Sequence, residues 1–512
     1  MSSARFVSYL ASASLSVAAC RAAPRVQVLG DSTRLKRSEP SPEKSAIFDG
    51  KVVRLRGARG ETLGVQVRIS DGRARQVRLE LPEAAALVSG FSVRFLRVAE
   101  PSTDMYGPSL GKGEYPDVLV PAQAGTITSS DLAYFDVAIP SSATPGRYQG
   151  TLSCSEQTLP VMLEVSSAHI DLRRDPLVWV FYLPSEIARS EGVPDDDGPA
   201  ELERESRYHE LFRAHGAFLA SDLGPARFPP RRRFMHDVKY WPVAIDTSSD
   251  AAIERDVHAW LDLFRGSGVT PFAIPVDEPH SADEKRHARQ IAEAIGHAGG
   301  GRPALLRGVT DEASASYGSA IDVFLSPVNI PVTARARAAS GERFWTYNGR
   351  PPAAGSMILD TDGVALRTWG FIAERYGVEL WYAWEGLYFS DRYNHGGPTD
   401  VLRDPLTFDE RSRGGKDWGN GDGLLAYPGV LPSMRLKALR RGLEDRLLLR
   451  ELSACGGAER AQRIAQRVVP RALGEAHGDR SWSIEEPSWE QARQEVLDAI
   501  EEQCHDEPVL AR

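Results

Sequence analysis

Two acids stand side by side in the stretch "PFAIPVDEPH", residues 271 to 280, where Asp277 and Glu278 follow an apolar run and precede Pro279. Side chains alternate along a strand, so both carboxyl groups can face one site only where the strand ends or bulges, and Pro279 indicates such an end. Paired carboxyl groups can act as an acid and a stabilising charge, as glycoside hydrolysis requires. The pair is a candidate catalytic centre; the alternative is an ordinary polar strand end.

Two carboxylates can also bind a metal ion, usually together with histidines or further acids. The eleven histidines form no HxxxH or HxH pattern. The "DTDG" at 360 to 363 lacks the third acid and the glutamate of a calcium loop, and it is interpreted as a turn. We therefore expect no metal and no cofactor.

Aromatic residues gather at two later points of the chain, each at an expected strand end. The apolar face of a pyranose ring stacks on such side chains, while its hydroxyl groups bind polar neighbours. Any one of these residues could instead belong to the core, but their clustering favours a pocket. The candidates for substrate binding are Trp345, Tyr347, Asn348, Trp381, Trp384 and Glu385.

Residues 171 to 455 alternate apolar runs with helical segments, which is typical of parallel strands joined by crossover helices. A helix is expected after Ser281, where Glu284 completes a capping box. The pattern predicts a (β/α)₈ barrel, in which active sites lie at the C-terminal ends of the strands, where the acid pair falls. Expected strands are 178–184, 272–276, 304–310, 321–327, 343–348, 356–360 and 379–386, with 217–222 as the candidate for an eighth.

Residues 46 to 170 are short alternating runs divided by turns, which predicts an antiparallel β-sandwich. Acids and histidines do not cluster there, so the region is interpreted as a supporting domain. Helical packing faces are expected in "PSMRLKALRRGLEDRLLLREL" and, within a C-terminal helical segment at 456 to 512, in "EPSWEQARQEVLDAIEEQ". In the second stretch Ser488 and Gln491 predict another capping box.

Residues 1 to 20 combine Arg5, a short apolar stretch and the sequence Val-Ala-Ala-Cys ending at Cys20, which resembles a bacterial lipoprotein signal. Residues 21 to 45 are polar and contain proline, as in a tether. We expect an exported lipoprotein anchored at the cell envelope, on its periplasmic face or at the cell surface, with Cys20 as the site of lipid attachment. The alternative is a weak secretory signal or a disordered N-terminus.

Composition restricts the partners. The net charge of −9 argues against nucleic acid, and no later stretch is long and apolar enough to span a membrane, so the N-terminal lipid is the only membrane contact expected. Among the remaining cysteines, Cys455 with Cys504 is the one disulfide considered, and Cys154 is expected to be a small buried residue. The expected partner is a glycan; the sequence gives no oligomeric state.

Three stretches together resemble glycoside hydrolase family 123 and its wider relatives: "VDEPH" at 276 to 280, "WTYNG" at 345 to 349 and "GDGLLAYPGVLPSMRLKALRRGLEDRLLL" at 421 to 449. Upstream, "YPDVLVP" and "TPGRYQGTL" resemble the N-terminal β-sandwich of that group. The resemblance covers most of residues 50 to 450. It implies a sandwich followed by a (β/α)₈ barrel, and a retaining β-N-acetylgalactosaminidase that uses substrate assistance.

The resemblance also implies roles for residues. The acetamido oxygen of the substrate attacks C1, so the enzyme supplies no nucleophile. Glu278 would protonate the leaving oxygen and later activate water, while Asp277 would orient the acetamido N–H and stabilise the oxazolinium intermediate. Tyr347 would donate to the acetamido oxygen. The walls would come from Trp345, Trp381 and Trp384.

Three alternatives stay open from the residues. The same acids could serve a glycosidase for a different sugar with a covalent or inverting mechanism. A non-catalytic, surface glycan-binding lipoprotein could retain the scaffold. The basic segment at 224 to 242 could favour an anionic glycan, or it could be a solvated loop.

Overall fold

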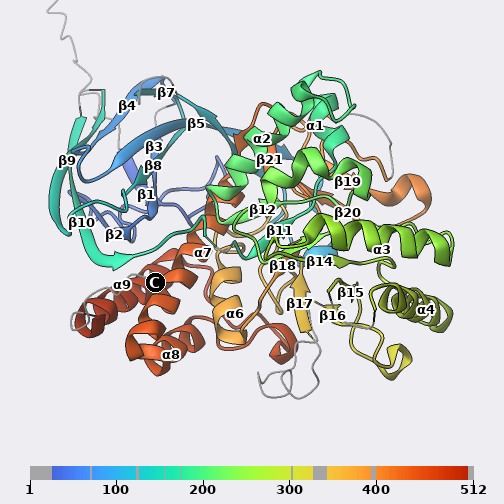
Figure 1. Ribbon diagram of the computed structural model, residues 1–512. Helices are drawn as coiled ribbons and strands as arrows, with labels where there is room; N and C mark the ends of the chain where they lie inside the picture. Colours follow the sequence, from blue (N-terminus) through green and yellow to red (C-terminus); the bar gives the residue numbers. More distant parts are fainter. Residues whose placement is uncertain are drawn as a thin grey trace, which may run out of the picture.

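The computed structural model describes residues 26–69, 72–122, 126–155, 157–174, 176–300, 304–326, 343–393 and 399–504. The expected lipid-bearing Cys20 lies outside these residues. In Figure 1 the N-terminal sheets form one side of the molecule and the parallel strands with their helices form the other, with α7 running between the two.

The N-terminal half contains two five-stranded sheets that share one hydrophobic core. Alternation of buried and exposed residues along strands such as β4 directs one side of each sheet into that core. The first sheet has the order β1 (Val26–Gly30), β3 (Thr62–Ile69), β8 (Leu132–Ala138), β5 (Leu87–Val98) and β6 (Gly113–Pro121). The second has the order β2 (Val53–Arg59), β10 (Gln157–His169), β9 (Gly146–Cys154), β4 (Arg75–Glu80) and β7 (Thr126–Ser129).

The prediction of a tether at 21 to 45 is wrong from residue 26 onward. Residues 26 to 30 form β1, which pairs antiparallel with β3 and is largely buried. The run "VQVLG" has the alternating β-branched character of a strand. The next two residues, Asp31 and Ser32, are also buried. The folded part of the chain therefore begins well before residue 46.

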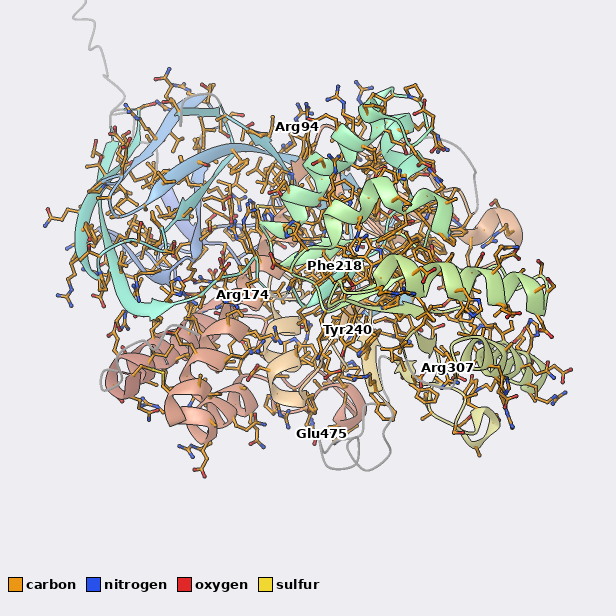
Figure 2. The ribbon with its side chains drawn as sticks, in the orientation of Figure 1. Arg94, Arg174, Phe218, Tyr240, Arg307 and Glu475 are labelled. Carbon is orange, nitrogen blue, oxygen red and sulfur yellow. A yellow bond between two sulfur atoms is a disulfide. The ribbon has the colours of Figure 1, made fainter. Side chains whose placement is uncertain are left out.

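Eight parallel strands form the second sheet system. The sheet curls, so that its two end strands approach each other: Phe218 of β12 stacks on Trp241 of β13 with ring centroids 6.0 Å apart. Phe218 and Tyr240 lie together in the middle of the molecule (Figure 2). The curled sheet is compatible with a TIM-like barrel. Its order is β12 (Ala217–Leu219), β11 (Val178–Val180), β18 (Trp381–Ala383), β17 (Arg343–Tyr347), β16 (Val323–Leu325), β15 (Leu306–Val309), β14 (Thr270–Ala273) and β13 (Tyr240–Pro242).

Most of the expected strands of this half overlap the observed ones, and the candidate at 217 to 222 contains β12. The strand expected at 356 to 360 is wrong: its apolar residues are buried, but as an irregular segment. The strand that the sequence analysis did not predict is β13, the three-residue "YWP" at the end of the basic segment. A strand of three residues that ends in proline shows too little periodicity to be predicted.

The helices are α1 (Pro184–Glu191), α2 (Pro199–Arg213), α3 (Asp250–Phe264), α4 (Ala282–Ala298), α6 (Thr368–Tyr376), α7 (Met434–Leu452), α8 (Ala458–Val468) and α9 (Glu486–Gln503). The capping box predicted at Ser281 and Glu284 is confirmed, since both reciprocal hydrogen bonds are present. The box predicted at Ser488 is wrong, because α9 starts earlier, at Glu486, and Ser488 lies inside it. None of the helices in the described ranges is long and apolar enough to cross a membrane.

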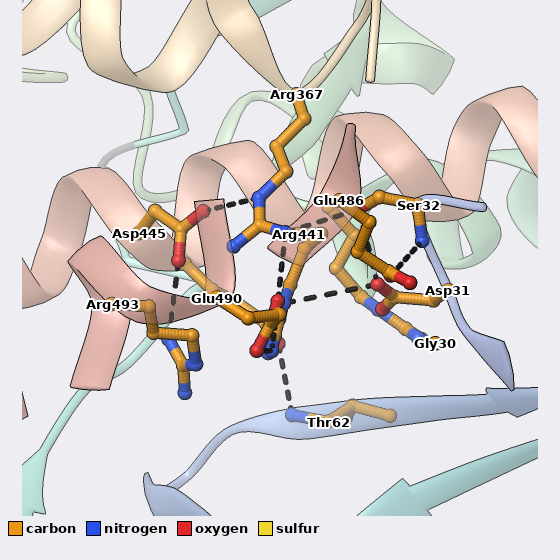
Figure 3. Close-up of polar contacts among 12 residues, drawn as sticks. Gly30, Asp31, Ser32, Thr62, Arg367, Arg441, Asp445, Glu486, Glu490 and Arg493 are labelled. Atoms are coloured by element: carbon orange, nitrogen blue, oxygen red, sulfur yellow. Dashed lines mark hydrogen bonds and ion pairs between the residues drawn. The ribbon is translucent and has the colours of Figure 1, made fainter. Parts of the chain in front are cut away.

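Helix α7 joins the two halves. Most of its leucines pack in the core, and four of its basic residues are buried as well: Arg435, Lys437, Arg440 and Arg441. Arg441 pairs with Glu61 of the N-terminal half and with Glu490 of α9. Glu490 also accepts a hydrogen bond from Arg367 (Figure 3). Buried charges are retained only when they are paired in this way.

A disulfide joins Cys455, just after α7, to Cys504 at the end of α9, as the sequence suggested. The Cα atoms of the two residues are 5.4 Å apart. Cys154 is buried, as expected. The smaller sheets pair β19 (Leu406–Asp409) with β20 (Trp418–Asn420) and β21 (Ala426–Tyr427) with β22 (Leu431–Pro432).

Candidate active site

The acid pair lies beyond the C-terminal end of β14, which stops at Ala273. Glu278 has a positive φ of 43°, a left-handed conformation that is uncommon for a residue other than glycine. This turn breaks the alternation of a strand, so that consecutive residues can line the same cavity. Both carboxyl groups are exposed to solvent within it. The sequence-based prediction that the strand ends before the pair is confirmed.

Thr310, which follows β15, holds both acids. Its hydroxyl group donates a hydrogen bond to Asp277 Oδ1 (2.6 Å) and accepts one from the Glu278 backbone N–H (2.6 Å). Tyr347, at the end of β17, donates from its hydroxyl group to Glu278 Oε1 (2.9 Å). Residues at the ends of β15 and β17 thus fix the pair that follows β14, as expected at the C-terminal side of a parallel barrel-like sheet.

A cavity of about 770 Å³ surrounds the pair. This volume lies in the range of small-molecule sites, and the walls are largely aromatic. Trp179 stacks on Tyr382 with ring centroids 4.1 Å apart, which closes one part of the cavity. The aromatic lining consists of Tyr106, Trp179, Phe181, Tyr347, Tyr382, Trp384, Tyr393 and Phe408.

Asn348 and Trp384 line the cavity, as predicted, and they are bound to each other. The Trp384 backbone N–H donates to Asn348 Oδ1 (2.9 Å), and the Trp384 indole N–H donates to Asp422 Oδ1 (2.9 Å). Asn348 has a φ of 49°, which asparagine tolerates better than most residues. The indole of Trp384 is therefore held at both its backbone and its ring.

Three predicted substrate-binding residues do not reach the cavity. Trp345 points to the inner side of the curled sheet, as Tyr347 does, but two residues deeper, where it packs on Tyr240 and Phe272. Trp381 points the other way, toward the helices, and stacks on Trp369 of α6 with ring centroids 4.5 Å apart.

Glu385 is the third of these residues. It is fully buried and ion-paired with Arg392, and burial raises its pKa to about 8. We therefore interpret three predicted substrate-binding residues as structural ones: Trp345, Trp381 and Glu385.

Other cavity residues were not predicted. Enclosure by the cavity walls, together with the nearby charge of Asp277, raises the pKa of Asp222 to about 6. Burial raises the pKa of Asp422 to about 7. Asp422 stands in the "GDG" of a stretch that the sequence analysis quoted, but without a role. Tyr106 and Thr310 carried no local signal, because only the fold brings them to the cavity.

The cavity is acidic. Five carboxyl groups line it, against the guanidinium groups of Arg350 and Arg413. The basic segment at 224 to 242 does not contribute to the lining. Its Arg231 is buried against Asp197, Glu201 and Glu205. This segment therefore gives no support to an anionic substrate. The lining carboxyl groups are Asp222, Asp277, Glu278, Glu410 and Asp422.

Within the described part of the chain, no three histidine, cysteine or acidic side chains are grouped so that they could hold a metal ion. The chemistry that this cavity offers is proton transfer and charge stabilisation by carboxyl groups, beside aromatic faces and hydroxyl donors.

The fold is similar to that of a solved glycoside hydrolase. A family 123 glycoside hydrolase from Clostridium perfringens, described in a study of glycolipid glycan hydrolysis, matches with a TM-score of 0.64 at 12% sequence identity. The match covers 94% of this chain and 98% of that one. A family 2 member from Bacteroides cellulosilyticus matches with a TM-score of only 0.27 at 10% identity, over 68% of this chain and 47% of that one. Comparison with protein-family models gives no match, and comparison with curated proteins gives none.

Proposed function

We propose that this protein is a retaining exo-glycosidase that hydrolyses a terminal β-linked N-acetylgalactosamine, or a related 2-acetamido sugar, by substrate-assisted catalysis. The observation that carries the proposal is the adjacent pair Asp277 and Glu278, bound by one Thr310 hydroxyl group in an aromatic cavity. The similarity to the family 123 fold supports it. We assign the two N-terminal sheets to the β-sandwich of that family and the eight parallel strands to its (β/α)₈ barrel.

In this mechanism Glu278 donates its proton to the glycosidic oxygen while the acetamido oxygen of the substrate attacks C1. The Thr310 hydroxyl group donates a hydrogen bond to Asp277 Oδ1, so Asp277 Oδ2 is the oxygen available to accept a hydrogen bond from the acetamido N–H. The negative charge of Asp277 then stabilises the positive oxazolinium ring. In the second step Glu278 takes a proton from water as the water opens that ring, which returns the enzyme to its initial state.

For Tyr347 we propose a role that differs from the expected one. Its hydroxyl hydrogen is directed at Glu278 Oε1, so in this arrangement it orients the acid rather than the acetamido oxygen. A hydrogen bond to one carboxyl oxygen leaves the other oxygen of Glu278 to carry the transferred proton. We propose that Tyr347 selects which Glu278 oxygen faces the glycosidic bond.

We further propose that the protein is exported and carries a lipid at Cys20. The disulfide between Cys455 and Cys504 supports export, since disulfides persist in oxidising compartments. Labelling cells with a palmitate analogue tests the anchor. The wild type should become labelled and a Cys20→Ser variant should not; an equally labelled variant would contradict the proposal.

The activity is tested with protein that lacks residues 1 to 20, on 4-nitrophenyl N-acetyl-β-galactosaminide and 4-nitrophenyl β-galactoside. We expect cleavage of the acetamido sugar alone. Glu278→Gln and Asp277→Asn should each lower kcat by roughly 100-fold or more. Asp283→Asn, an exposed acid in the first turn of α4, is the control and should leave kcat unchanged.

Other outcomes separate the alternatives. Cleavage of both sugars would contradict substrate assistance and favour a nucleophilic or inverting mechanism. Binding of a glycan without cleavage of any glycoside would favour the non-catalytic binding protein.

A further inference from the structure

The N-terminal half reaches into the cavity through the loop at 99 to 112, between β5 and β6. This loop carries Met105 and Tyr106, which line the cavity together with the acid pair. Tyr106 ends a short 3₁₀ helix, Asp104–Tyr106. The region that looked like a supporting domain in the sequence therefore supplies part of the cavity wall.

The loop is pinned to the second half by Asp360, which is fully buried. Ser102 donates to this carboxylate from both its backbone N–H (2.8 Å) and its hydroxyl group (2.6 Å), and the Ser109 hydroxyl group donates as well. The Leu110 N–H donates to the Asp360 carbonyl oxygen (2.8 Å). These bonds on both sides of Tyr106 fix the loop, so Tyr106 is presented by a rigid support.

The hydrogen of the Tyr106 hydroxyl group is available to donate to a ligand. Asn348 Nδ2 donates to its oxygen (3.4 Å), and this contact does not use the hydroxyl hydrogen. Two other tyrosines of the wall use theirs within the protein: Tyr347 donates to Glu278, and Tyr382 donates to the Trp384 carbonyl oxygen (3.5 Å). The side chain of Tyr106 is partly exposed, so a ligand can reach it.

The surroundings keep this hydroxyl group protonated. Burial raises the pKa of Tyr106 well above its usual value, and the charges of Asp422 and Glu278 raise it further. Tyr106 lines the same cavity as Glu278 and as Asp422, which binds the Trp384 indole. A neutral sugar hydroxyl is a suitable acceptor there, because an anion would be repelled by the same carboxylates.

We propose that Tyr106 is a substrate-binding, specificity-determining residue whose hydroxyl group donates a hydrogen bond to a ring hydroxyl of the terminal sugar. This inference rests on the proposed function of the same cavity. It makes the N-terminal half part of the binding site. It also explains why a loop of that half is bound so closely to Asp360.

The test compares Tyr106→Phe with the wild type on 4-nitrophenyl N-acetyl-β-galactosaminide and on its 3-deoxy, 4-deoxy and 6-deoxy analogues. On the parent substrate kcat/KM should fall roughly tenfold, the loss of one hydrogen bond. On the analogue that lacks the contacted hydroxyl, wild type and variant should be equal, because the shared interaction is absent in both. Tyr148→Phe, which removes an exposed hydroxyl group of β9, is the matched control.

Two results would overturn the inference: unchanged kcat/KM in Tyr106→Phe, or the same loss on the parent and on all three analogues. If the wild type cleaves no glycoside, the proposed function fails. The role of Tyr106 in sugar binding is then tested by a separate measurement. A crystal structure with N-acetylgalactosamine should then show a sugar hydroxyl within hydrogen-bond distance of Tyr106 Oη. A sugar bound elsewhere, or none bound, would contradict the subsite.

Discussion

Thr310 acts on both members of the acid pair through one hydroxyl group, and this gives a prediction at the scale of a single residue. Thr310→Val keeps the shape but removes both hydrogen bonds, so Asp277 and Glu278 lose their common anchor. We expect kcat to fall roughly 10- to 100-fold, because misplaced catalytic groups lose rate steeply. Steady-state kinetics with the chromogenic substrate measure this.

The control for this prediction is Thr310→Ser, which keeps the hydroxyl group and should retain most of the activity. Thr310 is buried, so the thermal unfolding of both variants is compared with that of the wild type. If Thr310→Ser loses as much activity as Thr310→Val, the hydroxyl group is not what positions the acids.

The candidate site could be predicted only in part at this scale. Asp277 and Glu278 were found because two adjacent acids before a proline are a local pattern. Trp345 and Trp381 were misplaced because the composition of a strand end does not tell which face or depth a side chain occupies. Tyr106 and Thr310 could not be found, since their roles depend on contacts between distant segments.

The first turn of α9 gives a prediction about pH at the scale of one element. Burial raises the pKa of Glu486 from 4.5 to about 7, although Ser32 N–H and the Thr33 hydroxyl group donate to it. The folded protein therefore keeps a proton that the unfolded chain releases. This contribution to stability is complete below about pH 4.5 and is lost as the pH rises through about 7.

Chemical denaturation at several pH values measures the effect. The difference in the free energy of unfolding between wild type and Glu486→Gln should fall by about 3 kcal/mol from pH 4.5 to pH 8. Glu485→Gln, a substitution at the neighbouring exposed acid, should leave the pH dependence of the wild type intact. A constant difference between wild type and Glu486→Gln would contradict the assignment.

Elements were predictable where one local pattern decides them, as in the capping box of α4. The segment at 356 to 360 was predicted to be a strand because it is apolar. Its backbone instead binds a side chain: the Met357 carbonyl oxygen accepts a hydrogen bond from Arg435. β13 was missed because pairing with β14, rather than its own three residues, makes it a strand. In both cases tertiary contacts override local propensity.

At the scale of the whole molecule, two of the stretches behind the family resemblance meet in one ion pair. Arg435 of α7 lies against Asp117 of β6, with Nη2 2.9 Å from Oδ2, and both are almost completely buried. Arg435→Met should leave the Asp117 charge unpaired and lower the free energy of unfolding by about 3–5 kcal/mol. Urea denaturation measures this.

The control for that variant is the double variant Arg435→Met, Asp117→Asn, which should recover part of the lost stability because the buried charge is gone.

Because α7 contacts both halves, the wild type should unfold in one transition. Two separate transitions would contradict the idea that α7 couples the halves.

The disulfide closes a loop of 49 residues across the C-terminal helices. By loop entropy such a bond stabilises by up to about 4 kcal/mol, so Cys455→Ser should lower the unfolding free energy by about 2–4 kcal/mol. Dithiothreitol should lower the stability of the wild type to that of the variant. Equal stability of oxidised and reduced wild type would contradict this.

The most direct test of substrate-assisted retention is a proton NMR time course of N-acetyl-β-galactosaminide hydrolysis, which identifies the anomer released first. Attack by the acetamido oxygen followed by water inverts C1 twice, so the account predicts that the β anomer appears first and converts to α only by mutarotation. Initial release of the α anomer, or no hydrolysis at all, would contradict the central claim.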